Sequence, residues 1–439
     1  MRTLIVAVLG LGAVGVIALS VVWGRRYQED LPQIFLGAAP LVGRSFRDGW
    51  DWRFGWGLVG AAVVAAADIA AVATGLWARA RLRWVVAASS IGAGVFATTL
   101  ALTDGVDGVL YGATHRTEYL VNLRTAPPAA EFVRTFVERI DDYSVHQRGH
   151  PPGFVLVLKA LDFVGLDGAW PAAMLSVVAT VALPAGVLVA VGATADGGWV
   201  RRVAPLLVVA PYALWMVTSA DAVYTAVGAW GVAALALGLR SRGGRAIAAG
   251  AVAGLLLGGL LFLTYGGITF VLLTLTVVAA AAWRRQPGVL DTAGAAVSIV
   301  GALTLTFAAA GFWWFAGAAA TRVEYWEGTA QFRTGTYFGV SNIAVALIAV
   351  GPATWAGLTR LRDRRVGVLV VGGALALLAA HVSQYSRGEV ERIWLLFYPW
   401  IAVAGGALLV SPNRRWAACW VGAQAVLAIV MQAALVSKW

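Results

Sequence analysis

DGVDGVLYGATHRTEYLVNLRTAPPAAEFVRTFVERIDDYSVHQRGHPPG, residues 104–153, is the one long polar stretch in a chain whose other segments are almost entirely apolar. It holds three of the four histidines, His115, His146 and His150. It also holds seven carboxylates, which are Asp104, Asp107, Glu118, Glu131, Glu138, Asp141 and Asp142. Titratable side chains are scarce elsewhere in the chain, so their concentration here predicts a functional site in this stretch.

The sequence on both sides of this stretch predicts a membrane protein. Of the 439 residues, 60% are hydrophobic and only 13% are charged, which excludes an ordinary soluble protein. About thirteen apolar runs are long enough to cross roughly 30 Å of hydrocarbon. These runs begin near residues 3, 55, 85, 169, 203, 222, 245, 266, 294, 338, 366, 393 and 417. Because backbone in lipid must satisfy its own hydrogen bonds, we expect one all-α polytopic bundle formed by residues 1–439.

The distribution of charge predicts the orientation of this bundle. One alternating set of loops carries seventeen basic and three acidic residues, whereas the opposite set carries sixteen basic and eighteen acidic residues. By the positive-inside rule the first set is cytoplasmic, so we expect a cytoplasmic N-terminus and an external loop over residues 104–168. The same rule explains the net charge of +11, so the charge does not indicate a nucleic-acid partner. The richness in Ala, Gly, Val and Arg, with only two lysines, is typical of a GC-rich bacterial genome, which places the bundle in a bacterial plasma membrane.

Two helices are expected inside the external loop. After Pro127-Pro128, the residues Phe132, Val133, Phe136, Val137 and Ile140 fall on one face at helical spacing, which predicts an amphipathic helix over 127–143 on the outer membrane surface. A second juxtamembrane helix over 154–163 begins at Pro151-Pro152, because proline suits the first helical turn. The next crossing is expected to start at Trp170.

The carboxylates of this loop include the candidate general base. Glu118 follows the third span in THRTEYL and lies among apolar neighbours, where burial would raise the pKa of a carboxyl. Asp104 and Asp107 lie closer to the end of the span and compete for the same role. His146 and His150 have a spacing of four, which suits two metal ligands on a helix. Gly149 and Pro151 interrupt a helix there, however, so helix capping and contact with an anion are favoured, and a divalent metal is compatible but not required.

Other polar residues near the outer ends of the spans extend the candidate site. Asp221 lies in a short turn between two spans, and Arg387, Glu389, Glu391 and Arg392 cluster before the run that begins near residue 393. Guanidinium groups there suit the geometry of a lipid phosphate. The glycines at 250, 254 and 258 share one helix face and predict close helix packing.

These features together resemble the GT-C membrane glycosyltransferases, in particular the branch of protein mannosyltransferases and lipid A aminoarabinose transferase. Glu118-Tyr119-Leu120 resembles that branch's acidic-Tyr signature, and His150-Pro151-Pro152-Gly153 resembles its His-Pro-Pro signature. GLLFLTY at 259–265 is similar to its Gly-Leu-x-x-Leu-Thr-Lys turn, with tyrosine in place of lysine, and 387–399 resembles its late arginine-and-aromatic entry to a helix. Two departures are that three spans precede the loop, and that His115-Arg116 occupies the position of the usual Asp-Glu pair.

The resemblance implies transfer of a sugar from a polyprenyl-phosphate donor to an acceptor on the outer face of the membrane. Glu118 would be the base, with Asp104 and Asp107 as the alternatives. The donor phosphate would be bound by His146, Arg148, His150, Arg387 and Arg392, and the acceptor cavity would include Tyr119, Asp221 and Glu391. The run Tyr143…His146…Gly149-His150-Pro151-Pro152-Gly153 is most similar to actinobacterial transferases that act on envelope glycans or lipoglycans, with arabinose, methylthioxylose or mannose as the sugar.

The main alternative is a membrane transporter or lipid flippase. That class typically has paired halves with broken helices at matching positions, and the sequence carries no convincing repeat. Its titratable groups lie in an outer loop, with Asp68 as the exception inside a span. A scaffold without catalysis leaves the concentration of histidines and carboxylates unexplained.

Overall fold

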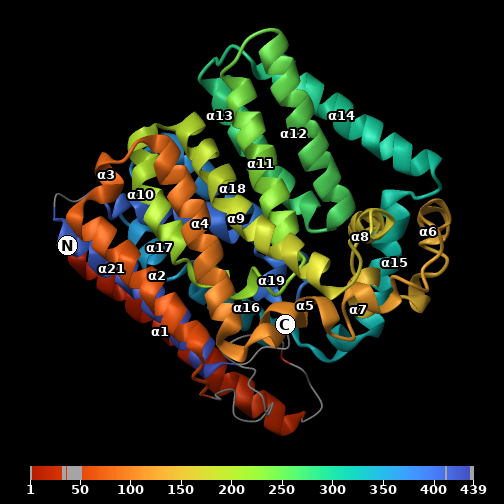
Figure 1. Ribbon diagram of the computed structural model, residues 1–439, viewed down its shortest axis with the longest axis horizontal. Coiled ribbons are helices and arrows are strands. Elements are labelled where there is room, and N and C mark those ends of the chain that lie inside the picture. The colour runs from red at the N-terminus through yellow and green to blue at the C-terminus, as the bar shows by residue number, and fades with distance from the viewer. Residues whose placement is uncertain (1, 32–35, 37–51, 411–412, 436–439) are drawn as a thin grey trace.

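The structure is a computed structural model, and it describes all residues except 1, 32–35, 37–51, 411–412 and 436–439. Within the described residues the chain forms helices and no strands (Figure 1). Nine of these helices are long and apolar enough to cross a membrane. They are α1 (Arg2–Asp30), α2 (Trp56–Thr74), α4 (Leu82–Ala101), α9 (Ala169–Thr194), α11 (Asp221–Leu239), α12 (Gly244–Leu263), α14 (Val289–Ala309), α18 (Arg364–Ser383) and α21 (Arg414–Ala434). The chain is therefore a helical, multi-pass membrane protein.

The other four predicted spans are shorter or broken in the structure. The segment near residue 203 forms α10 (Gly197–Val208), of twelve residues, and the segment near 266 forms α13 (Gly267–Trp283), of seventeen. The segment near 393 is divided among α19 (Val390–Ile393), α20 (Tyr398–Ala402) and the 3-10 turn η6 (Val403–Ala407). Proline and adjacent glycines occur in this last segment, and they interrupt a helix that hydrophobicity alone would predict to be continuous.

The predicted span near residue 338 is bent by 96° between α16 (Gly335–Val350) and α17 (Pro352–Leu358). Gly351 joins the two helices with a φ of 74°, a conformation that favours glycine. Gln424, buried on α21, donates from Nε2 to the Val350 carbonyl at 3.0 Å and accepts from the Ala353 amide at 3.2 Å. Thr354 Oγ1 also donates to the Val350 carbonyl at 2.6 Å, so two side chains satisfy the backbone groups at the bend.

The predicted glycine face of α12 is confirmed. A Cβ atom built on Gly254 would lie 2.5 Å from the Ala296 carbonyl oxygen, and one built on Gly250 would lie 2.4 Å from that of Thr292. Both carbonyls belong to α14, so the two helix backbones approach closely along this face.

The first helix of the external loop is shorter than predicted. The expected helix over 127–143 is instead α6 (Ala129–Thr135) followed by the 3-10 turn η3 (Ile140–Asp142). Its apolar face is covered by protein: the fully buried Phe136 ring packs against Phe312 and Tyr143. The second helix is confirmed as α8 (Gly153–Phe163), which starts directly after Pro152.

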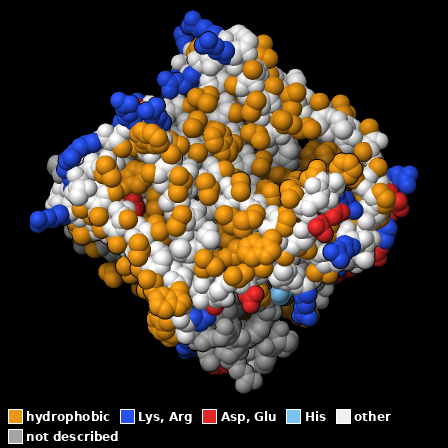
Figure 2. Space-filling model, in the orientation of Figure 1, with side chains coloured by type: hydrophobic (Ala, Val, Ile, Leu, Met, Phe, Trp, Pro, Cys, Tyr) orange, Lys and Arg blue, Asp and Glu red, His pale blue; other side chains and the backbone are white. Residues whose placement is uncertain are grey.

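The loop packs at one end of the two central helices. α9 begins directly after the loop and packs against α11, α4 and α5 (Val106–Thr114). Figure 1 shows the loop helices α6 and α8, together with α7 (Val145–Arg148), on the right of the view beside α15 (Trp314–Glu327). Figure 2 shows hydrophobic side chains across the middle of the same face, and basic side chains at its upper and left edges. The candidate site is thus at one end of an apolar bundle.

Candidate active site

Four charged or titratable side chains from distant parts of the chain meet in the interior. Glu118 immediately precedes the 3-10 turn η2 (Tyr119–Asn122), and His146 lies on α7. Asp221 is the first residue of α11, and Arg392 lies on α19. Their exposed fractions are between 2% and 6%. Buried charged groups of this kind are retained only when they are paired, so this Glu118 cluster is the first candidate for a functional site.

Backbone hydrogen bonds hold α7 against the segment that carries Glu118. The His146 amide donates to the Thr117 carbonyl at 3.1 Å, and Ser144 Oγ donates to the Glu118 carbonyl at 3.0 Å. His146 Nδ1 then lies 2.6 Å from Glu118 Oε1, a contact of ion-pair length in which Nδ1 is not aligned as a hydrogen-bond donor. The two residues are therefore positioned by the backbone as well as by their side chains.

His146 also contacts Arg392. Arg392 Nη2 lies 2.6 Å from His146 Nε2, and because a guanidinium only donates, Nε2 is the acceptor. An imidazole that accepts at Nε2 is neutral and carries its proton on Nδ1, on the side of Glu118. Burial, reinforced by the charge of Arg392, also holds the pKa of His146 well below its usual range.

Arg392 joins the two carboxylates of the cluster. Its Nη1 lies 3.7 Å from Glu118 Oε1 and 3.5 Å from Asp221 Oδ2. Ser219 Oγ donates to the same Asp221 oxygen at 2.6 Å and fixes its orientation. One guanidinium thus faces Glu118, Asp221 and the neutral His146, with a net charge of −1 when both carboxyls are ionised.

The electrostatic environment makes Glu118 a weak acid. Burial raises the pKa of Glu118 from 4.5 to about 7, although the positive charge of Arg392 opposes this effect. Glu118 Oε2 is buried and has no hydrogen-bond partner among the described residues. A carboxyl with a pKa near neutrality and one unoccupied oxygen can act as a general base.

An aromatic layer covers the cluster. The hydroxyls of Tyr119 and Tyr224 lie 2.9 Å apart, and the ring of His150 packs against both tyrosines. His150 Nδ1 is 2.8 Å from the His146 carbonyl oxygen, so the turn that begins at His150 is hydrogen-bonded directly to α7. Tyr224, on α11, is an addition to the predicted site, because in the sequence it resembles any aromatic residue of an apolar run.

A narrow pocket lies on the other side of Tyr119. Its walls come from α5, η2, α8 and α9 and from the turn that precedes α11, and they are mostly apolar. Tyr119 and Phe154 separate this pocket from the cluster, since their rings pack edge to face with centroids 4.8 Å apart. Tyr119 is the polar group of this pocket nearest Glu118.

A second charged group lies beside the first, around Glu389. Arg333 Nη2 is 3.0 Å from Glu389 Oε1. Burial raises the pKa of Glu389, but the charges of Arg333 and Arg392 outweigh this effect and leave the pKa below its usual value. The backbone of Glu389 has a φ of 61°, directly after Gly388 with a φ of 83°. A non-glycine residue in this region is strained, and such strain is often found at functional sites. Arg333 was not predicted from the sequence, since no motif surrounds it.

Two predicted phosphate-binding arginines face α15 and not the Glu118 cluster. Arg387 packs over the Trp326 ring at 4.7 Å and donates from Nη1 to the Arg333 carbonyl at 2.6 Å. Arg148 Nη1 lies 2.7 Å from Glu324 Oε2. The predicted set of His146, Arg148, His150, Arg387 and Arg392 is therefore divided between two neighbouring groups.

The two competing candidates for the base, Asp104 and Asp107, have other surroundings than Glu118. Asp104 forms an ion pair with Arg53, which also donates to two backbone carbonyls at the end of α21, and this contact explains Asp104 as a link between helices. Asp107 is exposed in the first turn of α5. Glu391 is fully buried on α19 beside Arg392. The geometry thus separates Glu118 from its two competitors for the role of base.

Among the described residues no group of three or more His, Cys, Asp or Glu side chains has the arrangement of a metal site. The ring of His150 contacts the backbone carbonyl of His146, so the two imidazoles are not arranged as a pair of metal ligands.

Comparisons with protein-family models, with curated proteins and with solved structures found no match to this chain.

Proposed function

We propose that the protein is a membrane glycosyltransferase of the GT-C type. It moves a sugar from a polyprenyl-phosphate donor to a glycan or lipoglycan acceptor on the outer face of a bacterial plasma membrane. The observation that carries this proposal is the Glu118 carboxyl, which has a pKa of about 7 and contacts a neutral histidine and an arginine at the end of an apolar helical bundle. The sequence resemblance described above supplies the class of donor.

The chemistry assigned to Glu118 is general base catalysis. The acceptor hydroxyl oxygen forms a bond to the anomeric carbon of the sugar while the bond from that carbon to the phosphate oxygen breaks. The hydroxyl proton passes to Glu118, and the polyprenyl phosphate leaves with the bonding electron pair. The transition state has oxocarbenium character, so the negative charge that develops on the phosphate needs a cationic neighbour.

Arg387 and Arg148 are the proposed cations for this phosphate. Both are only partly buried, and both contact residues of α15, namely Trp326 and Glu324. Arg392 has a different task, because it is fully engaged with Glu118, His146 and Asp221. It keeps part of the Glu118 population ionised within a buried environment, as the opposing effect of its charge on the pKa of Glu118 indicates.

The acceptor would enter through the pocket beside Tyr119. Glu118 is only 2% exposed, so its free oxygen becomes accessible when the Tyr119–Tyr224 layer shifts on substrate binding. Glu118 would then be accessible only when the acceptor occupies the pocket, and water would be kept from the base at other times.

One observation favours the transporter alternative: the α16–α17 pair is a broken span of the kind that lines transport pathways. In the part of the chain that the structure describes, it is the single bent pair, and the Gln424 side chain closes its exposed backbone. The break therefore has a structural role here and no matching partner in a second half.

The test is a transfer assay with the purified full chain in lipid vesicles. The donors are polyprenyl-phosphate mannose and polyprenyl-phosphate arabinose, and the acceptor is a lipoglycan extract. Glu118→Gln should insert normally and lose about 100-fold or more of the rate, the usual contribution of a general base. The matched control is Glu131→Gln, which changes an exposed acid of the same loop and should keep the rate. Full activity in Glu118→Gln, or movement of the lipid donor across vesicles without transfer, would contradict the proposal.

A further inference from the structure

A second pocket lies at the opposite end of α11 from the Glu118 cluster. Asp221 begins α11 and belongs to that cluster, whereas Leu239 ends α11 and lines the second pocket. A helix of 19 residues is about 28 Å long. The second pocket is narrow and open to the surface, and it forms where the ends of α9, α11 and α13 meet the start of α18.

The lining of this second pocket is amphipathic. Ala236, Leu239 and Val277 belong to its apolar walls, whereas Arg284, Gln286 and Arg365 supply polar groups. Such a lining suits a ligand with one anionic group and an apolar remainder.

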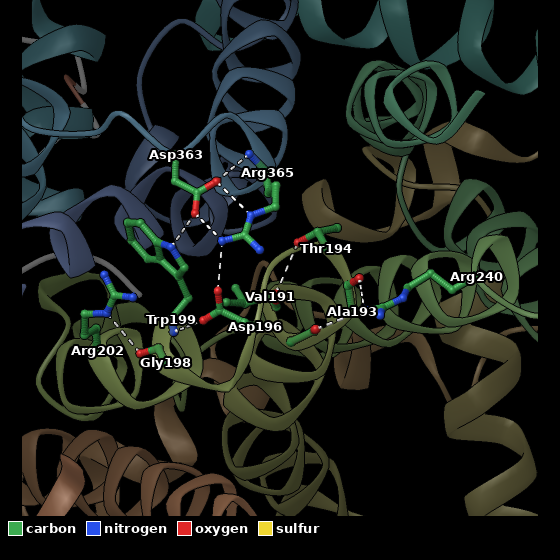
Figure 3. Close-up of polar contacts among 11 residues, drawn as sticks. Val191, Ala193, Thr194, Asp196, Gly198, Trp199, Arg202, Arg240, Asp363 and Arg365 are labelled. Atoms are coloured by element: carbon green, nitrogen blue, oxygen red, sulfur yellow. Dashed lines mark hydrogen bonds and ion pairs between the residues drawn. The ribbon is translucent and has the colours of Figure 1, made fainter. Parts of the chain in front are cut away.

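Arg365 is held in place by two carboxylates, as Figure 3 shows. Its Nη2 donates to Asp363 Oδ2 at 2.8 Å and to Asp196 Oδ2 at 2.9 Å, and its Nε donates to Asp363 Oδ1 at 3.1 Å. Trp199 Nε1 donates to Asp363 Oδ2 at 2.8 Å and fixes that carboxylate in turn. Nη1 of Arg365 has no partner among the described residues. The bonds to the two carboxylates restrict the orientation of the guanidinium, so Nη1 can donate to a ligand.

Two more guanidinium groups have donors to spare. Arg284 uses only Nη2, which donates to the Arg364 carbonyl at 3.3 Å. Arg240 uses only Nη1, which donates to the carbonyls of Ala193 at 2.7 Å and Gly192 at 3.5 Å (Figure 3). Ala193 lines the pocket, so Arg240 is anchored at its edge. Three arginines against two aspartates leave the site with a positive charge and several free N–H groups.

We propose that this second pocket binds the phosphate of an anionic phospholipid headgroup. Guanidinium groups match phosphate in both charge and hydrogen-bond geometry, and the apolar residues at the mouth of the pocket would contact the glycerol and acyl carbons of a lipid whose phosphate binds the arginines. A free phosphate would use the arginines but gain nothing from those apolar residues. The loops at this end are the strongly basic set, which is the set expected to face the anionic inner leaflet.

The experiment measures lipid binding and not transfer, so its outcome is independent of the proposed function. Purified full-length protein in detergent is titrated with phosphatidylglycerol, and bound lipid is counted by native mass spectrometry. Phosphatidylcholine is the zwitterionic comparison, and inorganic phosphate is the competitor that distinguishes a lipid from a free anion. A photoactivatable phosphatidylglycerol then identifies the peptides in contact with the lipid.

The variants are Arg284→Gln and the double variant Arg240→Gln/Arg284→Gln, which leave the paired Arg365 intact. The matched control is Arg415→Gln, which removes an exposed arginine from the start of α21, outside the residues that line the pocket. Arg284→Gln should weaken phosphatidylglycerol binding about tenfold, the double variant should weaken it further, and the control should not change it.

Three outcomes would overturn the inference. Equal weakening in Arg415→Gln would mean that lipid responds to the basic surface as a whole. Displacement of the lipid by inorganic phosphate at comparable concentration would mean that the site holds a free anion. Crosslinks that fall outside α9, α11, α13 and α18 would place the lipid elsewhere.

Discussion

His146 Nδ1 lies 2.6 Å from Glu118 Oε1, and both residues are almost fully buried. Because Arg392 donates to the opposite ring nitrogen, the imidazole is neutral and carries its proton on Nδ1, the nitrogen nearer the carboxylate. A neutral group adds no charge to offset the desolvation of Glu118. This pairing is therefore consistent with a carboxyl whose pKa stays near neutrality although an arginine is close by.

The first prediction concerns pH. If Glu118 is the base, the transfer rate rises with pH through about 7, because only the ionised carboxylate accepts a proton. Stability should change in the opposite direction. A folded-state pKa raised from 4.5 to about 7 stabilises the fold at low pH, and this contribution, on the order of 3 kcal/mol, is lost as the pH rises toward 7. Thermal unfolding and transfer rates across this range measure both trends.

The control for pH is Glu118→Gln, which cannot ionise. Between about pH 4.5 and 7, the unfolding temperature of this variant should fall less steeply with pH than that of the unchanged protein, because the contribution of Glu118 is absent. Equal slopes in the two proteins would show that Glu118 is not the group responsible.

The second prediction concerns His146 as a positioning residue. His146→Ala removes the ring nitrogen to which the buried Arg392 Nη2 donates, which should cost about 1–3 kcal/mol of unfolding free energy. It should also shift the pH midpoint of transfer downward, because water entering the space lowers the desolvation of Glu118. His146→Gln can still offer Arg392 an acceptor and should recover most of the stability. A purely structural histidine would change stability and leave the pH midpoint in place.

The third prediction concerns the bend between α16 and α17. Gln424→Leu removes the acceptor of the Ala353 amide, whereas the Val350 carbonyl keeps the Thr354 hydroxyl as a donor at 2.6 Å. One unsatisfied buried amide costs about 1–3 kcal/mol, so the variant should unfold at a lower temperature in detergent. Gln331→Leu, an exposed glutamine whose amide bonds only carbonyls of its own turn, is the comparison and should have little effect. Equal unfolding temperatures of the two variants would show that Gln424 does not stabilise the bend.

The fourth prediction uses two glycines of α12 as a matched pair. A Cβ on Gly254 would lie 2.5 Å from a backbone oxygen of α14, whereas one on Gly259 would meet nothing within 4 Å. Gly254→Ala should therefore destabilise the protein by about 1–3 kcal/mol through overpacking. Gly259→Ala should be neutral or stabilising by up to about 1 kcal/mol, because alanine favours helix. Unfolding in detergent, followed by circular dichroism, distinguishes the two, and equal effects would contradict the close contact of α12 and α14.

The sequence predicted the long helices well where apolar residues continue without interruption. α9 begins at Ala169, one residue before the predicted Trp170, and the glycine face of α12 packs as expected. The sequence predicted spans less well where an apolar run contains a glycine or proline that interrupts the helix. Gly351 and Pro399 lie in apolar runs, and the helices break at or near both because hydrophobicity does not supply a missing amide or a helical φ.

The candidate site was predicted residue by residue but not as an arrangement. Glu118, His146 and Arg392 were identifiable because titratable side chains are rare in this chain. Their convergence depends on tertiary packing of α7 and α19, which no local pattern specifies. For the same reason Arg148 and Arg387 were grouped with them, although both face α15 in the structure.

The distance along the chain between His146 and Arg392 has a consequence for biosynthesis. The two residues are 246 positions apart, so at about 5–20 residues per second the ribosome makes Arg392 roughly 12–50 s after His146. A chain that ends before Arg392 cannot form the Glu118 cluster, because the guanidinium that joins Glu118, His146 and Asp221 is missing. The arrangement proposed for catalysis is therefore completed only when α19, near the end of the chain, is in place.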